Sequence, residues 1–370
     1  MNNKEEKCLN NSFLVSKNIL LENNRLWMLT NMANVLCEFS FPGMKLEKYY
    51  VLPMDTVIEY GCHSFVKMNN TFFVLPFYDK EFIVVDTDNN KTYTELIPYA
   101  DDESDRKGKF HIAVENSGKI LMVGHNISGF FYYVNDMFHV DYSYITNITN
   151  AGVKVDNLPL FSECFTQSNE YVYIPVLGQK IIVEVNIVTE KYKVYDLKND
   201  IQIRTIDLID ENTFFLTTMC GEKVIWSKTE GIQEYKNLNL LEGDERWYMR
   251  AFYVNGKFYY ISGCERKIFV EKNGVISELY FDYPMDGAYP IGWTQFEAIY
   301  KKDDLIIVQT RSDGTIFCIN TKTDEINKVC FNISLCEKNN LIRDAYSNKK
   351  IGEILDERKD FNLNNFISFI

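Results

Sequence analysis

The chain has 370 residues, of which 46% are hydrophobic and 15% aromatic, and its formal net charge at pH 7 is −13. This composition excludes a disordered chain, because there is ample apolar surface to bury. An acidic chain also lacks the basic face that neutralises phosphates, so no nucleic-acid partner is expected. The length suits either two ordinary domains or one domain built from repeats.

The N-terminal segment MNNKEEKCLNNS (1–12) is polar, so we expect no secretory signal. No stretch reaches the roughly 18 apolar residues that cross a bilayer, so no membrane association is expected either. Nine cysteines are spread along the chain without a CxxC pair. We therefore expect nine reduced thiols and a cytoplasmic location.

One aromatic-aliphatic run of about six residues recurs at intervals of 42 to 52 residues. In chain order the copies are RLWMLT (25–30), TFFVLP (71–76), KILMVG (119–124), YVYIPV (171–176), TFFLTT (213–218), KFYYIS (257–262) and DLIIVQ (304–309). A turn and a second apolar run follow each copy, from VLCEFSF (35–41) in the first unit to IFCINT (316–321) in the last. The spacing predicts seven similar units.

Each unit contains two further strands. A third, alternating run follows the second, as in KYKVYDL (191–197), and a more irregular strand precedes the first, as in CHSFVKM (62–68). The pattern therefore predicts four strands per unit, A to D in chain order, joined by short hairpin turns. SFLVSKNILL (12–21) serves as the A strand of the first unit, so we expect the units to close without exchanging a strand.

Four-stranded units that repeat every 40–50 residues or so are typical of a β-propeller. One such sheet has two apolar faces and buries both only when neighbouring units stack around an axis. Runs such as TFFVLP (71–76) lack polar alternation, as expected for strands covered on both sides. The predicted fold class is all-β, a seven-bladed β-propeller of four-stranded blades with a short C-terminal helical tail. A β-sandwich or two barrels with accidental spacing is the alternative.

Two segments resemble known repeats. YVYIPVLGQKIIVEVNIVTEKYKVYDL (171–197) and TFFVLPFYDKEFIVVDTDNNKTYTELIP (71–98) resemble kelch and related bacterial β-propeller repeats. The resemblance concerns architecture and covers roughly residues 13–336. It implies a ligand site on the axis, at the face of the D-to-A and B-to-C connections. The longest D-to-A connections are 99–109, 149–161, 240–248 and 283–293.

The chain divides into a propeller, residues 1–340, and a tail, residues 341–370. In the tail, Ile351, Ile354 and Leu355 have helical spacing, and so does the apolar set from Leu363 to Ile370. We expect short helices that pack on the propeller. A helix that docks on a partner is the alternative, because the last nine residues are strongly apolar.

Polar residues lie near the starts of six predicted A strands, seven to nine residues before the first residue of the B-strand run that follows. They are His63, His111, Glu163, Arg204, Arg250 and Glu297. They should face one central channel, where mixed charge can bind a polar, zwitterionic or sugar-like ligand. Alternatively, these strands are polar only because they line a water-filled channel.

Trp247 and Trp293 flank the same face, either as aromatic platforms for a ligand or as packing between blades. His111, His125 and His139 fall within one unit, but on segments that point to different places, so no metal site is predicted. The chain has no GxxxxGK[ST], GxGxxG or GxSxG segment, and no cofactor is predicted.

Two functions from different classes remain open. The leading one is a non-catalytic binding or scaffolding module that engages a protein, peptide or glycan through its axial face. Its binding residues would be His63, His111, Glu163, Arg204, Arg250, Trp247 and Trp293. The alternative is a lyase, epimerase or hydrolase that acts on a polar small molecule or sugar, with Glu163 or Glu297 as the base.

Overall fold

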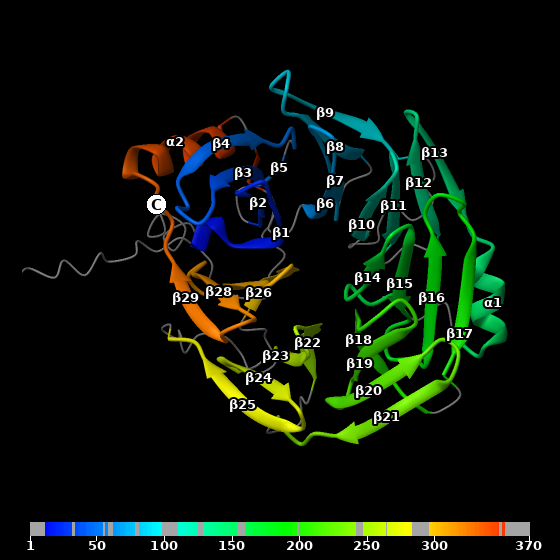
Figure 1. The fold of residues 1–370 in the computed structure, drawn as a ribbon. Coiled ribbons are helices and arrows are strands. Elements are labelled where there is room, and N and C mark those ends of the chain that lie inside the picture. Colours follow the sequence, from blue (N-terminus) through cyan, green and yellow to red (C-terminus); the bar gives the residue numbers. More distant parts are fainter. Residues whose placement is uncertain are drawn as a thin grey trace, which may run out of the picture.

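The computed structural model describes residues 12–31, 34–54, 56–57, 62–77, 81–97, 110–124, 129–153, 160–197, 200–241, 247–263, 265–282, 296–347 and 350–351. Its strands form seven four-stranded antiparallel sheets, each made of strands that are consecutive in the chain. The sheets surround a central axis as the blades of a propeller (Figure 1). The predicted seven-bladed β-propeller is confirmed.

Each blade runs outward from the axis through strands A to D (Figure 1). The A strands are β1 (Ser16–Glu22), β6 (Cys62–Met68), β10 (Phe110–Asn116), β14 (Thr166–Ser168), β18 (Ile203–Leu208), β22 (Tyr248–Val254) and β26 (Phe296–Lys302). The B strands are β2 (Arg25–Thr30), β7 (Thr71–Pro76), β11 (Lys119–Gly124), β15 (Tyr171–Pro175), β19 (Thr213–Thr218), β23 (Lys257–Ser262) and β27 (Leu305–Thr310).

The C strands are β3 (Val35–Ser40), β8 (Glu81–Asp86), β12 (Phe130–Val134), β16 (Ile181–Asn186), β20 (Glu222–Ser227), β24 (Lys267–Lys272) and β28 (Ile316–Asn320). The D strands are β4 (Leu46–Val51), β9 (Lys91–Leu96), β13 (Met137–Asp141), β17 (Tyr192–Asp196), β21 (Gly231–Asn237), β25 (Val275–Tyr280) and β29 (Glu325–Val329).

Two-residue hairpins with left-handed residues join many neighbouring strands. Between β1 and β2, Asn23 and Asn24 have φ of 50° and 58°, and Asn69 has φ of 57° between β6 and β7. Asn255 and Gly256, at 53° and 71°, make the same turn between β22 and β23. Such turns match the right-handed twist of the strands, and asparagine adopts positive φ more readily than most residues. These local preferences fix the hairpin register.

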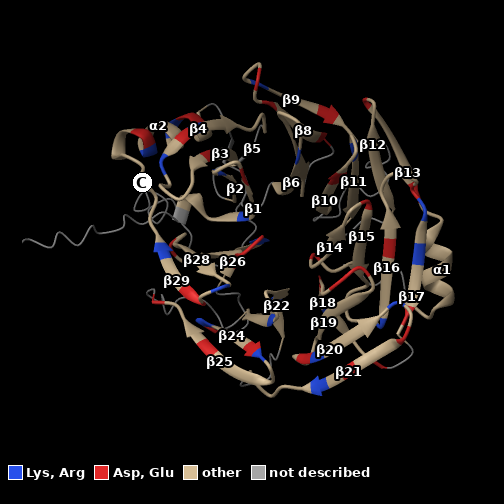
Figure 2. Cartoon of the chain, viewed as in Figure 1, with Lys and Arg blue, Asp and Glu red and all other residues tan. Residues whose placement is uncertain are grey.

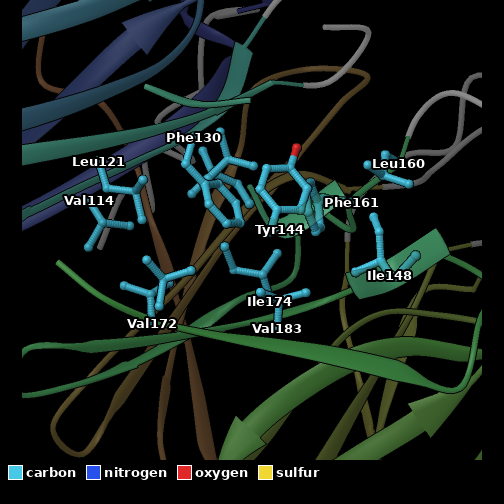
Figure 3. Packing of buried hydrophobic residues seen from close by; sticks show 14 of the residues in the cluster. Val114, Leu121, Phe130, Tyr144, Ile148, Leu160, Phe161, Val172, Ile174 and Val183 are labelled. Atoms are coloured by element: carbon cyan, nitrogen blue, oxygen red, sulfur yellow. The ribbon is translucent and has the colours of Figure 1, made fainter. Parts of the chain in front are cut away.

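The hydrophobic core is divided among the seven blade interfaces. The described residues form seven buried clusters, each with side chains from two neighbouring blades. Between blades three and four, α1 (Tyr144–Asn150) adds Tyr144 and Ile148 to the cluster (Figure 3). Tyr144 stacks on Phe130 with ring centroids 4.1 Å apart, and the Gly129 N–H donates to its hydroxyl at 2.9 Å. Each sheet is thus covered on both faces.

Blade one closes the ring against blade seven without strand exchange, as predicted. β1 lies beside β26 (Figure 1), and the preceding 3-10 turn η1 (Ser12–Leu14) reaches blade seven. The Gln309 side chain is fully buried at this seam. Its Oε1 accepts from the Ser16 N–H at 2.8 Å, and its Nε2 donates to the carbonyl oxygens of Leu14 at 3.0 Å and Gly314 at 3.2 Å. Gln309 therefore fastens the first blade to the last.

The C-terminal helix α2 (Leu335–Tyr346) packs against blade one. Ser334 and Glu337 form a capping box at its start. The Tyr49 hydroxyl donates to Asp344 Oδ2 at 2.7 Å and ties the helix to β4. No helix among the described residues is long and apolar enough to span a membrane.

The helical interpretation of the tail is wrong at Ile351. This residue lies in β30 (Lys350–Ile351), which pairs in parallel with β5 (Thr56–Val57), because its backbone bonds to the segment between blades one and two. Residues 352–370 lie outside the described part of the chain. The division at residue 340 stays a prediction, and α2 spans it.

The expectation of nine reduced thiols is also wrong. Six described cysteines are free, and four of them are buried. Cys330, however, is disulfide-bonded. The cytoplasmic location stays a prediction.

Replacing Gln309 with Leu should lower the free energy of unfolding by about 2–4 kcal/mol, because three buried hydrogen bonds are lost and their backbone partners stay buried. Urea unfolding followed by tryptophan fluorescence measures this change. Gln233→Leu on the exposed face of β21 is the matched control and should change stability by less than about 0.5 kcal/mol. Equal stability of the two variants would mean that apolar packing alone closes the seam.

Candidate functional site

The A strands enclose a cavity of about 690 Å³ on the propeller axis. Because these strands all run in one direction along the axis, their polar residues form two layers. The mouth layer, near the strand starts, comprises Lys17, His63, His111, Glu163, Arg250 and Glu297. The far layer, near the strand ends, comprises Glu22, Lys67, Glu115, Asp207 and Lys301. Charged segments of both signs lie on the inner strands (Figure 2).

A repeated backbone irregularity positions the side chains of the mouth layer. Six A strands shift register directly after their first residue, as β-bulges do. The residues at the shift are Lys17, His63, His111, Arg204, Met249 and Glu297. In blade four, Glu163 lies in the corresponding segment, between the Phe161–Val176 bridge and β14. A bulge re-aims a side chain, so five of these seven positions face the cavity with a polar group.

Lys17 lies between the two carboxylates of the mouth layer. Its Nζ is 3.8 Å from Glu163 Oε2 and 3.7 Å from Glu297 Oε1. The buried Glu297 carboxylate is also 3.5 Å from Arg311 Nε and accepts a hydrogen bond from Asn31 Nδ2 at 3.2 Å. Blades one, four and seven thus share one network of charges.

The Glu163 carboxylate is held in its charged form. The Lys17 ammonium lowers the pKa of Glu163 well below its usual 4.5, against the opposing effect of burial, and Arg250, His63 and Arg204 lower it further. A carboxylate with so low a pKa is a weak base at neutral pH. Its chemistry suits binding or positioning better than proton transfer.

Arg250 is held against the channel wall. Its guanidinium donates to Cys164 Sγ, and Cys164 Sγ lies 3.2 Å from the Met249 carbonyl oxygen, to which it donates. Burial favours the neutral form of Arg250, but Cys164 and Glu163 outweigh it and raise the pKa of Arg250. The mouth layer therefore keeps this positive charge at every ordinary pH.

Arg204 was expected in the channel wall but lies beside it. The cavity is lined by its neighbour Thr205, while the Arg204 guanidinium lies 4.7 Å from the ring centroid of Trp247. Trp247 packs directly on the turn after β23, where a Cβ on Gly263 would come within 2.7 Å of its Cη2. The indole is thus packed in place, and a cation–π contact orients Arg204.

The other predicted residues divide between the cavity and the undescribed segments. His63 lines the cavity and stacks on Phe77, with ring centroids 4.8 Å apart, and His111 lines it from a nearly buried position. Trp293 lies outside the described residues. Of the four long D-to-A connections, 99–109 and 283–293 also lie outside them, while 149–161 begins within α1. The ligand-binding roles of all these residues stay predictions.

The far layer consists mainly of closed ion pairs. Asp207 Oδ2 accepts from Lys301 Nζ and from the Tyr253 N–H, the latter at 2.7 Å. Burial raises the pKa of Asp207, and Lys301 opposes that rise. Lys67 pairs in the same way with Glu22. The two pairs join blade one to blade two and blade five to blade seven, and leave little free charge.

Sequence reasoning missed Lys17, although a signal for it exists. Lys17 stands eight residues before Arg25, within the spacing that singled out the other ring residues. A second signal predicts the far layer: Lys67, Glu115 and Lys301 each stand four residues after a mouth-layer residue, and a strand repeats its facing every two residues. Arg311 and Asn31 were missed because each directly follows a B strand, whereas the search for polar residues covered only the starts of A strands.

Among the described residues, no three His, Cys, Asp or Glu side chains gather as metal ligands. His111 faces the channel, whereas His139 pairs with Glu190 at the outer strand β13, so these two do not converge. His125 lies outside the described residues.

No protein-family model matches the chain, and no curated protein matches it significantly in sequence. Solved propellers resemble it in fold. Virginiamycin B lyase from Staphylococcus aureus has 12% identity and a TM-score of 0.59, over 82% of this chain and 94% of its own. YCF48 bound to D1 peptide has 10% identity and a TM-score of 0.57, over 82% and 93%. BamB from Moraxella catarrhalis has 8% identity and a TM-score of 0.51, over 81% of each chain.

At these identities the likeness shows the fold alone. It supports the resemblance to propeller repeats at the level of architecture. It assigns the chain to neither the kelch family nor another named family.

Replacing Lys17 with Met should raise the pKa of Glu163, because the largest of its stabilising charges is removed. A depressed pKa stabilises the fold above the unfolded value, and this contribution is lost as the pH falls through the folded value. The variant should therefore be less stable than the wild type at neutral pH. Its free energy of unfolding should also fall less steeply below about pH 4.5.

Carboxyl-carbon NMR titration of Glu163 measures its pKa directly, and urea unfolding at pH 3 to 7 measures the stability. The exposed Lys45→Met variant controls for a lost surface charge. An unchanged Glu163 titration in Lys17→Met would show that Lys17 does not hold this carboxylate in its charged form.

Proposed function

We propose that this propeller is a non-catalytic binding module that engages a protein or peptide partner at the mouth end of its axial channel. The observation that carries the proposal is the state of its two mouth-layer carboxylates. Lys17 contacts both, and Arg311 and Asn31 hold Glu297 as well. Groups fixed in this way present a charge pattern to a ligand.

The enzyme alternative needs one of these carboxylates as a general base. A base works best when its pKa lies near the operating pH. Glu163 departs in the opposite direction, since Lys17 and the neighbouring cations lower its pKa well below 4.5. Glu297 Oε1 has Lys17 and the Asn31 amide as partners, and Arg311 lies 3.5 Å from Glu297 Oε2. The geometry supports binding over proton transfer.

The structural neighbours are compatible with both classes. The Staphylococcus aureus protein is a lyase, and YCF48 is bound to a peptide in its solved structure. One scaffold therefore carries both kinds of function, so the function has to be inferred from the side chains of the site. A peptide-bound propeller of this size supports the binding proposal as a precedent.

The proposal predicts a partner that depends on the mouth end. A tagged wild type should retain a stoichiometric protein from the native host, and Arg204→Gln with Arg250→Gln should lose it, because two cations are removed. Quantitative mass spectrometry of the eluates measures the loss. The matched control is Lys322→Gln with Arg343→Gln, two exposed cations with side chains 65% and 69% accessible.

A partner retained equally by the mouth variant and the control would place the binding surface elsewhere. The enzyme alternative is tested by incubating wild type and Glu297→Gln with a host metabolite extract. Consumption of one compound by the wild type alone would contradict the proposal. Retention of oligosaccharides on a glycan array, without a protein partner, would replace the peptide partner by a glycan.

A further inference from the structure

Two cations of the mouth layer, Lys17 and Arg250, line the axial cavity and act on the same carboxylate, that of Glu163. The side chains of Lys17 and Glu163 are 20% and 22% exposed, and Arg250 is half-buried. A ligand in the cavity can therefore reach all three groups. The mouth layer brings accessible charges of both signs together at one level of the channel.

The hydrogen-bonding capacity of these two cations is largely unused. Lys17 Nζ lies 3.8 Å from Glu163 Oε2 and 3.7 Å from Glu297 Oε1, beyond the roughly 2.7–3.2 Å of a hydrogen bond. Within the described part of the chain, Arg250 donates only to Cys164 Sγ, a weak acceptor, and a guanidinium has several further N–H groups. Both cations can donate to a ligand without losing a hydrogen bond to an oxygen.

The charges that face the mouth of the cavity do not balance. The Glu297 side chain is only 1% exposed, and its charge is compensated by Arg311, 3.5 Å away. Glu163 is then the one accessible carboxylate of the mouth layer, and it faces two cations. Arg204 has the smallest effect of the cations that act on Glu163 and does not line the cavity. One negative charge on a ligand would restore the balance.

The far layer does not attract an anion in the same way. Lys301 pairs with Asp207, and Lys67 pairs with Glu22. The remaining charged group of that layer, Glu115, is an acid. An anionic group that enters the channel is therefore stabilised at the mouth layer and repelled further in.

The single excess charge also selects the kind of anion. A carboxylate carries one negative charge and matches a planar guanidinium with two parallel hydrogen bonds. A phosphate monoester carries roughly −1.5 to −2 at neutral pH, and its second charge would lie against Glu163. The mouth layer therefore favours a carboxylate over a phosphate.

We infer that Lys17 and Arg250 bind one carboxylate of the partner, on the side chain of an Asp or Glu residue in an extended peptide segment. A cavity of about 690 Å³ admits such a segment but no folded domain. Both cations are recessed, and a side chain carries its carboxylate farther from the backbone than a chain terminus does. The inference rests on the proposed binding function and adds the group that is recognised. A free carboxyl terminus is the other source of this group.

The test uses four pools of N-acetylated random hexapeptides built from uncharged residues. Three pools have an amidated carboxyl terminus and Glu, Gln or phosphoserine at the third position. The fourth has Gln there and a free carboxyl terminus. The full chain is incubated with each pool and passed over a desalting column, and the retained peptides are counted by mass spectrometry.

The Glu pool should be retained about tenfold or more over the Gln pool, because the charge-assisted hydrogen bonds are lost with Gln. The phosphoserine pool and the free-terminus pool should each be retained less than the Glu pool. Lys17→Gln and Arg250→Gln should each abolish the preference for Glu, whereas the exposed Lys322→Gln should keep it. Melting curves of these variants exclude loss of the fold as the cause.

Glu163→Gln gives a prediction of the opposite sign. The change removes the negative charge that opposes a doubly charged ligand, so retention of the phosphoserine pool should rise about tenfold over the wild type. A gain of binding cannot result from a failure to fold. An unchanged retention of this pool would overturn the selection by charge.

Equal retention of the Glu and Gln pools by the wild type would overturn the carboxylate inference and leave axial peptide binding intact. Stronger retention of the phosphoserine or the free-terminus pool than of the Glu pool would overturn it as well. So would a preference for Glu that survives both Lys17→Gln and Arg250→Gln. Retention of no pool also overturns the inference, whereas the host-partner experiment alone decides the proposed function.

Discussion

A four-stranded sheet with two apolar faces buries both of them only between two other sheets, and this requirement shapes the whole molecule. Seven clusters of buried side chains fill the seven interfaces between blades. The first blade has to meet the last, and the buried Gln309 amide makes that contact specific. Wedge-shaped packing around an axis also leaves a space that the A strands line with polar groups.

The backbone of the A strands determines which side chains line that space. A register shift recurs near the start of six A strands, and in five of them the residue at the shift lines the cavity. The same backbone device therefore serves different side chains in different blades. Lys17, His63 and Glu297 occupy equivalent positions although their charges differ. The blades share a fold, while the channel carries a pattern that no single blade has.

The sequence predicted the fold in detail because hairpins and strand patterns are local. The boundaries of β7 and β23 match the predicted runs residue for residue. The ring of polar residues was predicted from spacing, but Arg204 departs from it, since its contact with Trp247 depends on packing between distant segments. The unusual pKa of Glu163 depends on Lys17, which is 146 residues away in the chain. Ile351 in β30 has no local signal, because its pairing depends on β5, a segment remote in sequence.

The seam at Gln309 also affects how the molecule unfolds. In a linear stack of repeats, each unit contacts only its neighbours, and the terminal units lack one of them. Such an array can lose its ends first, one repeat at a time. Here the contacts of Gln309 with Ser16 and Leu14 give the first and last blades a second neighbour. No blade is then terminal in the energetic sense, so we expect the ring to unfold as one cooperative unit and to offer proteases no frayed end blade.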